Sequence, residues 1–142
     1  MVKQVSIFLE NRFGRLHEVT KLLAENKLNI RALSVADTSD FGILRLIVDS
    51  PDKAYDVLKK ENYTVSAAEV VAIEVSDQPG GLANILGIFD DNKINVEYMY
   101  AFLAKIPDKA IMIFRFDDNK AVMEKLKDKG VKFVAAAELY HL

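Results

Sequence analysis

Cysteine is absent from this chain of 142 residues. Without it the protein can form no disulfide, no thiolate metal site and no iron–sulfur cluster. Histidine is almost absent too, because only His17 and His141 are present, and a metal site needs several ligands that converge. We therefore assign no metal site and expect no cofactor.

An excess of charge of one sign is also missing. The chain has 19 Lys and Arg residues against 21 Asp and Glu residues, and its basic residues are scattered rather than clustered. Binding to a phosphate backbone needs a basic patch, so we expect no nucleic-acid partner.

Long hydrophobic runs are lacking as well. No apolar run approaches the roughly 18 residues that a membrane span needs. The first residues, Met-Val-Lys-Gln-Val-Ser-Ile-Phe, do not have the basic region, apolar stretch and cleavage site of a secretory signal. We expect a cytoplasmic protein that does not enter a membrane.

A repeated motif is what the chain does have. Asn11-Arg-Phe-Gly14-Arg-Leu16 recurs as Asp77-Gln-Pro-Gly80-Gly-Leu82, and Asn29-Ile30 recurs as Asn95-Val96. Every matched pair of positions is 66 residues apart, which indicates an internal duplication. We expect two domains of one kind, at residues 1–68 and 69–142. Because a domain of about 70 residues is marginally stable alone, the two should pack together.

Both copies show the same order of expected elements. β-branched runs predict strands, apolar residues at helical spacing predict helices, and polar clusters predict the turns between them. Strands are expected at 5–9, 30–36, 43–48 and 63–69 in the first copy, and at 71–75, 96–102, 110–116 and 131–138 in the second. Helices are expected from 16 to about 26, 51 to about 61, 82 to about 92 and 118 to about 129, with hairpin loops at 37–40 and 105–109.

This β-α-β-β-α-β order predicts an α+β protein of two ferredoxin-like units. With right-handed crossovers, each unit folds most simply into a four-stranded antiparallel sheet with strand order 4-1-3-2 and both helices on one face. No linker rich in proline, glycine or serine separates the copies, so the domains are not expected to tumble freely.

This fold supports many functions, and three of them fit the residues poorly. An RNA-binding module needs base-stacking aromatics in a basic third strand, which neither copy has. A cluster-carrying ferredoxin needs cysteine. A hydrolase needs a nucleophile or an acid–base pair, and no such set recurs at matched positions. We therefore expect no enzymatic activity.

The second copy, Asp77-x-Pro-Gly80-x-Leu82-x-x-Ile85 followed by Ile94-Asn95-Val96, closely resembles the signature of the ACT domain, a regulatory amino-acid-binding module. The first copy, Asn11-x-x-Gly14-x-Leu16 with Leu28-Asn29-Ile30, is a degraded version of it. The resemblance covers essentially the whole chain, twice. It implies a stand-alone tandem ACT protein that binds a small amino acid and carries no catalytic domain.

The turn suits such a ligand physically. Backbone N–H groups at a helix start, uncovered by glycine, can hold a carboxylate, and side-chain oxygens can hold an ammonium group. In ACT domains the ligand typically sits between two units, with the turn of one facing the second strand of the other. This implicates Asn11, Arg12, Phe13, Gly14, Arg15 and Leu16 with Asn95 and Val96, and Asp77, Gln78, Pro79, Gly80, Gly81 and Leu82 with Asn29 and Ile30.

Structural roles for the same residues stay open. Asn11 and Asp77 can simply cap a turn, Gly14 and Gly80 can serve only to provide a positive φ, and the two later asparagines can bond local backbone. The first copy also departs from the pattern, because Phe13 replaces proline and Asn11 replaces aspartate. It places Arg12 and Arg15 where the helix dipole disfavours positive charge, so either an anion binds there or these side chains point into solvent.

We expect a homodimer, because each sheet should leave one face without helices. The strands at 96–102 and 110–116 are too apolar for that face to stay wet, and a second identical chain would cover Met99, Phe102, Ile111 and Ile113 and their neighbours. The alternative function is a ligand-free assembly module that regulates a partner enzyme.

Overall fold

A computed structural model describes residues 1–37 and 39–142 of the protein. The chain divides into two compact units, one formed by Lys3–Ala68 and the other by Met1–Val2 together with Glu69–Leu142. No helix among the described residues has the length and apolar character to cross a membrane.

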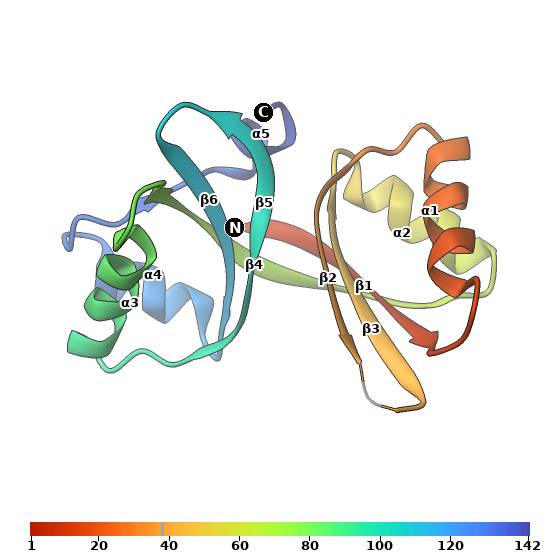
Figure 1. The fold of residues 1–142 in the computed structure, drawn as a ribbon, viewed down its shortest axis with the longest axis horizontal. Coiled ribbons are helices and arrows are strands. Elements are labelled where there is room, and N and C mark those ends of the chain that lie inside the picture. Colours follow the sequence, from red (N-terminus) through yellow and green to blue (C-terminus); the bar gives the residue numbers. More distant parts are fainter. Residues whose placement is uncertain (38) are drawn as a thin grey trace. The chain divides into compact units, whose positions relative to one another are not determined.

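The first unit follows the predicted order of elements (Figure 1). β1 (Val2–Glu10) leads to α1 (Arg15–Glu25), β2 (Ile30–Asp37), β3 (Phe41–Val48), α2 (Pro51–Lys60) and β4 (Thr64–Ser76). β3 lies antiparallel between β1 and β2, and β4 pairs with β1. The strand order is therefore the predicted one.

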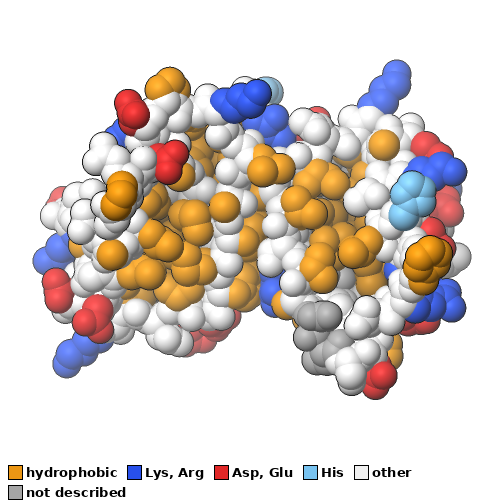
Figure 2. Space-filling model, in the orientation of Figure 1, with side chains coloured by type: hydrophobic (Ala, Val, Ile, Leu, Met, Phe, Trp, Pro, Cys, Tyr) orange, Lys and Arg blue, Asp and Glu red, His pale blue; other side chains and the backbone are white. Residues whose placement is uncertain are grey.

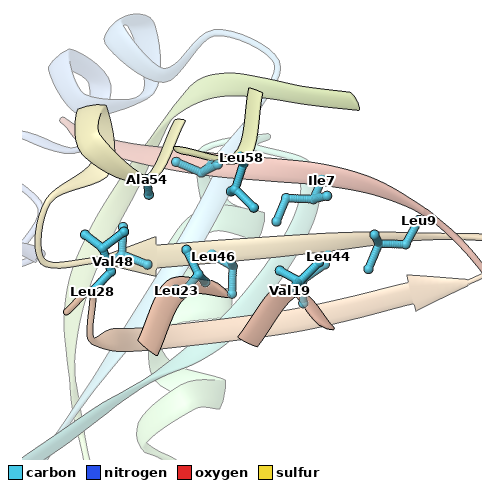
Figure 3. Close-up of a cluster of buried hydrophobic side chains, with 11 residues drawn as sticks. Ile7, Leu9, Val19, Leu23, Leu28, Leu44, Leu46, Val48, Ala54 and Leu58 are labelled. Atoms are coloured by element: carbon cyan, nitrogen blue, oxygen red, sulfur yellow. The ribbon is translucent and has the colours of Figure 1, made fainter. Parts of the chain in front are cut away.

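Both helices of the first unit cover one face of its sheet, because alternate strand residues point to that face. Ile7, Leu44 and Leu46 are buried from the strand side, and Val19, Leu23 and Leu58 meet them from the helices (Figure 3). Burying a side chain of this size contributes roughly 1.5–3 kcal/mol. Val19 and Leu23 lie on the same side of α1 because they are spaced i and i+4, and their burial turns that side toward the sheet.

The second unit repeats this plan. The later part of β4 leads to α3 (Gly81–Asp91), β5 (Val96–Ile106), β6 (Lys109–Phe116), α4 (Asn119–Leu126), β7 (Lys132–Phe133) and α5 (Ala136–Tyr140). β6 lies between β5 and β4, and β4 also pairs with β7, so the strand order again corresponds to 4-1-3-2. Its core is more aromatic, because Phe89 contacts Phe114 and Phe116 edge-on with ring centroids 5.2 and 5.4 Å apart.

The prediction of two separate four-stranded sheets is wrong in one respect. β4 is a single strand of 13 residues that ends the first repeat and begins the second. The described residues therefore form seven strands rather than eight. The apolar run that continues through residues 70–73 gives the chain no turn residue at which to break the strand.

The end of the chain also differs from the prediction. Residues 131–138 were expected to be extended, but β7 has two residues and α5 begins at Ala136. Alanine has the highest helix propensity, and Leu139 of α5 is fully buried, so local preference and burial both favour the helix. α4 likewise ends at Leu126, short of 129, and turns follow it as far as Gly130, which has a positive φ of 78°.

The other expected elements are close to the observed ones. β5 extends to Ile106, so the hairpin loop expected at 105–109 shrinks to Pro107 and Asp108. At the hairpin expected at 37–40, Thr38 lies outside the described residues.

The expected homodimer stays a prediction. Phe102, Ile111 and Ile113 are at most 6% exposed within this single chain, and Met99 packs against the core beneath the helices.

Candidate functional site

Two exposed turns carry most of the predicted site residues. One runs from Asn11 to Gly14 between β1 and α1, and the other runs from Asp77 to Gly80 between β4 and α3. Gly14 and Gly80 have φ angles of 87° and 89°, a left-handed conformation that glycine adopts at little cost. The predicted position of Asn11 and Asp77, each between a strand and the following helix, is confirmed, whereas their part in binding stays a prediction.

Equivalent backbone hydrogen bonds hold both turns. The N–H of Arg15 donates to the carbonyl of Arg12, as the N–H of Gly81 donates to that of Gln78. The backbone N–H groups of Glu18 and Asn84 then donate to the carbonyls of Gly14 and Gly80. In these two pairs of bonds each donor and each acceptor is 66 residues from its counterpart, so the duplication in sequence is a duplication in structure.

The first turn of each helix has unpaired donors. Neither Asn11 nor Asp77 caps its helix through a side chain, because the N-cap residue is the glycine. Among the described residues, no acceptor bonds the backbone N–H of Leu16 or His17, or that of Leu82 or Ala83. Free N–H groups at a helix start, together with the helix dipole, favour a bound anion.

The two turns differ at the first helical position. Gly81 is buried, and a Cβ atom there would lie 1.9 Å from the carbonyl oxygen of Ser76. The equivalent residue in the first repeat is Arg15, whose side chain is 23% exposed. One turn therefore has a tightly packed backbone at this position, and the other has a cationic side chain.

Two contacts hold the guanidinium group of Arg15, one at Nη1 and one on its flat face. Its Nη1 donates to Glu18 Oε2 at 2.8 Å, and the group lies over the ring of Tyr63 at 5.5 Å from the centroid. Burial raises the pKa of Tyr63, and the nearby Glu18 carboxylate raises it further. Arg15 Nε is buried and has no hydrogen-bond partner.

A pocket opens beside the first turn, with a volume of about 160 Å³. Leu9, Leu16, Val35 and Leu44 make its lining largely aliphatic, whereas the polar lining comes from the turn and its surroundings. The complete lining is Leu9, Glu10, Asn11, Arg12, Arg15, Leu16, Val35, Gly42 and Leu44. Pockets for drug-sized ligands occupy about 300–1,000 Å³, so this one suits a smaller metabolite.

Exposed hydrophobic side chains surround the pocket. Leu16 and Val35 are each 47% exposed, and Phe13 projects entirely into solvent from the turn. Figure 2 shows hydrophobic side chains reaching the surface between the strands and α1 of the first unit, with charged groups around them.

The predicted asparagines at the second strands lie elsewhere in their own units. Asn29 precedes β2, and its backbone N–H donates to the Asp49 carboxylate at 3.1 Å. Asn95 precedes β5 and lines a different pocket of about 310 Å³ beside α4. The strand pairings place both at the end of the sheet opposite to their own turn. Whether either meets the turn of the other repeat stays a prediction.

The structure thus brings together four predicted residues, namely Asn11, Arg12, Arg15 and Leu16, in one pocket. Sequence reasoning missed Leu9, Glu10, Val35, Gly42 and Leu44, which complete it. Glu10 and Leu9 directly precede the motif and could have been included as the end of its strand. The residues from β2 and β3 could be found only from the pairing register.

Comparisons with known proteins agree with this architecture. The family model described as "ACT domain pair" matches residues 1–142. Protein BT0572 from Bacteroides thetaiotaomicron has 44% sequence identity and a TM-score of 0.91, over 99% of this chain and 96% of that one. The regulatory subunit of aspartate kinase from Thermus thermophilus, in a ligand-free form, has 13% identity and a TM-score of 0.65, over 90% and 92% of the two chains.

The similarity to the aspartate kinase subunit shows a shared fold at that level of identity. No protein with curated annotation matches the chain. The whole-chain family match, together with the similarity to the Bacteroides protein, shows that this chain belongs to the family of ACT domain pairs.

Proposed function

We propose that this protein is a non-enzymatic regulator that binds a free amino acid at its strand–helix turns. The observation that carries the proposal is the pocket beside Asn11, Arg12 and Arg15, where an aliphatic lining meets charged and polar groups. Unpaired N–H groups at the start of α1 add a favourable place for a carboxylate. A small zwitterion with an apolar side chain matches this chemistry.

Similar proteins support a regulatory role. The subunits from Thermus thermophilus and Thermus flavus, with TM-scores of 0.65 and 0.59, are regulatory subunits of aspartate kinase. By analogy, this chain senses an amino acid and passes the signal to a partner enzyme.

A screen of thermal unfolding against the twenty amino acids tests the proposal. A ligand at 100 times its dissociation constant stabilises the fold by about 2.7 kcal/mol, which shifts the melting temperature by several degrees. Calorimetric titration would then give the number of sites. If no amino acid at millimolar concentration shifts the melting temperature, the sensor proposal fails.

A ligand-free assembly module is the second candidate. Phe8 and Phe41 favour it, because both are nearly half exposed and their ring centroids lie 5.2 Å apart on the helix-free face of the first unit. Such a pair is an apolar contact site for another protein, including a second copy of this chain. Sedimentation at micromolar concentration should give twice the chain mass of 16.0 kDa if the chain dimerises, and the monomer mass would refute the homodimer.

A further inference from the structure

We propose that the pocket of the first repeat selects an aliphatic amino acid, whose carboxylate binds the Nε–Nη2 edge of Arg15. This inference rests on the proposed amino-acid binding and specifies its ligand class. It follows from how Arg15 is bonded, from the side chains around the pocket and from the difference between the two turns.

Arg15 has one occupied edge and one unoccupied edge. Glu18 takes Nη1, and Tyr63 covers the face of the group. Nε is buried without a partner, and no described residue accepts a hydrogen bond from Nη2. A guanidinium group binds carboxylates side-on through two parallel N–H donors. A ligand carboxylate at the pocket wall would accept from Nη2, and Nε becomes the second donor once the Arg15 side chain turns to uncover it.

The remaining lining decides which side chain the ligand carries. Leu9, Val35 and Leu44 offer no hydrogen-bond partner, so a polar or charged ligand side chain would lose its hydration there without compensation. An aliphatic side chain gains from the same contact. Glu10 and Asn11 also line the pocket, and their oxygen atoms suit the ligand's ammonium group.

Charge balance at the pocket agrees with a zwitterion rather than an anion. Arg12 is paired with Glu10 at 3.5 Å, and Arg15 is paired with Glu18 at 2.8 Å. A ligand with no net charge leaves both pairs in place. A dicarboxylic amino acid would bring an additional negative charge beside two carboxylates.

The second turn has no counterpart of this arrangement. Gly81 occupies the position of Arg15, and its close approach to the Ser76 carbonyl leaves no room for a side chain. The arginine-dependent site is therefore a property of the first repeat alone.

Calorimetric titration with L-leucine, L-leucinamide, L-aspartate and L-lysine tests this inference. The parent protein should bind L-leucine at least about tenfold more tightly than L-leucinamide, which lacks the carboxylate charge. In Arg15→Gln this preference should largely disappear, whereas Lys21→Gln, which removes an exposed charge from the same helix, should keep it. A purely structural role for Arg15 would not alter the ratio between the two ligands.

A second pair of variants tests the pocket itself. Val35→Phe should fill the space and weaken L-leucine binding about tenfold or more. Leu33→Phe is the matched control, because Leu33 lies on the same strand face, is 43% exposed and does not line the pocket. Both sites are on the surface, so both variants should fold.

The outcomes separate this inference from the proposed function. If L-aspartate or L-lysine binds more tightly than L-leucine, or if Arg15→Gln keeps the preference for L-leucine over its amide, the inference is wrong and amino-acid binding still holds. If no amino acid binds the parent, both fail.

Discussion

Leu9 of β1 lies directly opposite Gly42 of β3, so a buried leucine faces a residue without a side chain. The missing side chain leaves space at the corner of the sheet, where the pocket of the first repeat lies. In the second repeat the same register places Val75 opposite Ala110. A methyl group thus occupies the equivalent place beside the second turn.

Gly42→Ala should therefore separate stability from binding. Gly42 lies within β3, in extended backbone that alanine also adopts, so the free energy of unfolding should rise by about 0.4–1 kcal/mol through the unfolded state. The added methyl group should weaken amino-acid binding at the same time. Urea unfolding and calorimetric titration of one preparation give both quantities. A variant that binds as tightly as the parent would show that this corner does not hold ligand.

Replacing either of two glycines in α3 by alanine should change the free energy of unfolding, but in opposite directions. Gly81→Ala places a methyl group against the Ser76 carbonyl, so we expect a loss of more than about 1 kcal/mol in the free energy of unfolding. Gly87 lies inside the helix, and a Cβ atom added there would meet no atom within 4 Å, so Gly87→Ala should gain up to about 1 kcal/mol. Denaturant midpoints measured side by side would reveal the contrast, and similar midpoints would contradict it.

Asp77→Ala should leave stability almost unchanged, because its side chain does not cap α3 and its backbone N–H bond to the Asp108 carbonyl survives the substitution. Asp118→Ala is the control. The Asp118 side chain accepts from the Ala121 N–H at 3.0 Å, and losing such a cap costs about 0.5–2 kcal/mol.

Amino-acid titration of Asp77→Ala then distinguishes its two possible roles. Weaker binding with parent-like stability would identify Asp77 as a ligand residue. Unchanged binding would remove it from the proposed site.

Glu74 should make stability depend on pH in the acid range. Its carboxylate accepts from Lys132 at 2.9 Å and contacts Lys109 at 3.4 Å, and the hydrogen bond to Lys132 is the main reason that its pKa lies below the usual 4.5. Because the folded-state pKa is lowered, this stabilisation is complete above pH 4.5 and disappears as the pH falls through the folded-state value.

The difference in unfolding free energy between the parent and Glu74→Gln should consequently shrink from pH 7 to pH 3. Urea titrations at several pH values measure it. Glu124→Gln removes a carboxylate that is 78% exposed, and it should show little change over the same range. A pH-independent difference for Glu74→Gln would argue against the ion pairs.

Sequence alone was sufficient for the repeat and for the order of its elements. The 66-residue offset, the helical spacing of Val19 and Leu23 and the glycine turns are local signals, and each has a direct structural consequence. α5 was missed because Ala135–Glu138 resembles the extended end of the first repeat, whereas the burial of Leu139 is a tertiary effect.

From the sequence, only those site residues that follow one another along the chain could be predicted. Asn11–Leu16 could be found from the motif, but Val35 and Gly42 enter the pocket through strand register, which depends on how β2 and β3 pair. The burial of Arg15 Nε could not be predicted either, since sequence reasoning allowed this side chain to point into solvent.

The strand shared by the two repeats limits how such a gene can change. A deletion that removed one copy would have to cut within Thr64–Ser76, because this strand begins in the first unit and continues without a break into the second. The hairpin loops, in contrast, differ in length between the two copies. The carbonyl that accepts from the Asn11 N–H belongs to Asp40, whereas its counterpart for Asp77 is Asp108, two positions later than the repeat spacing requires. The two copies within this one chain therefore already differ in hairpin length, while a single continuous strand joins them.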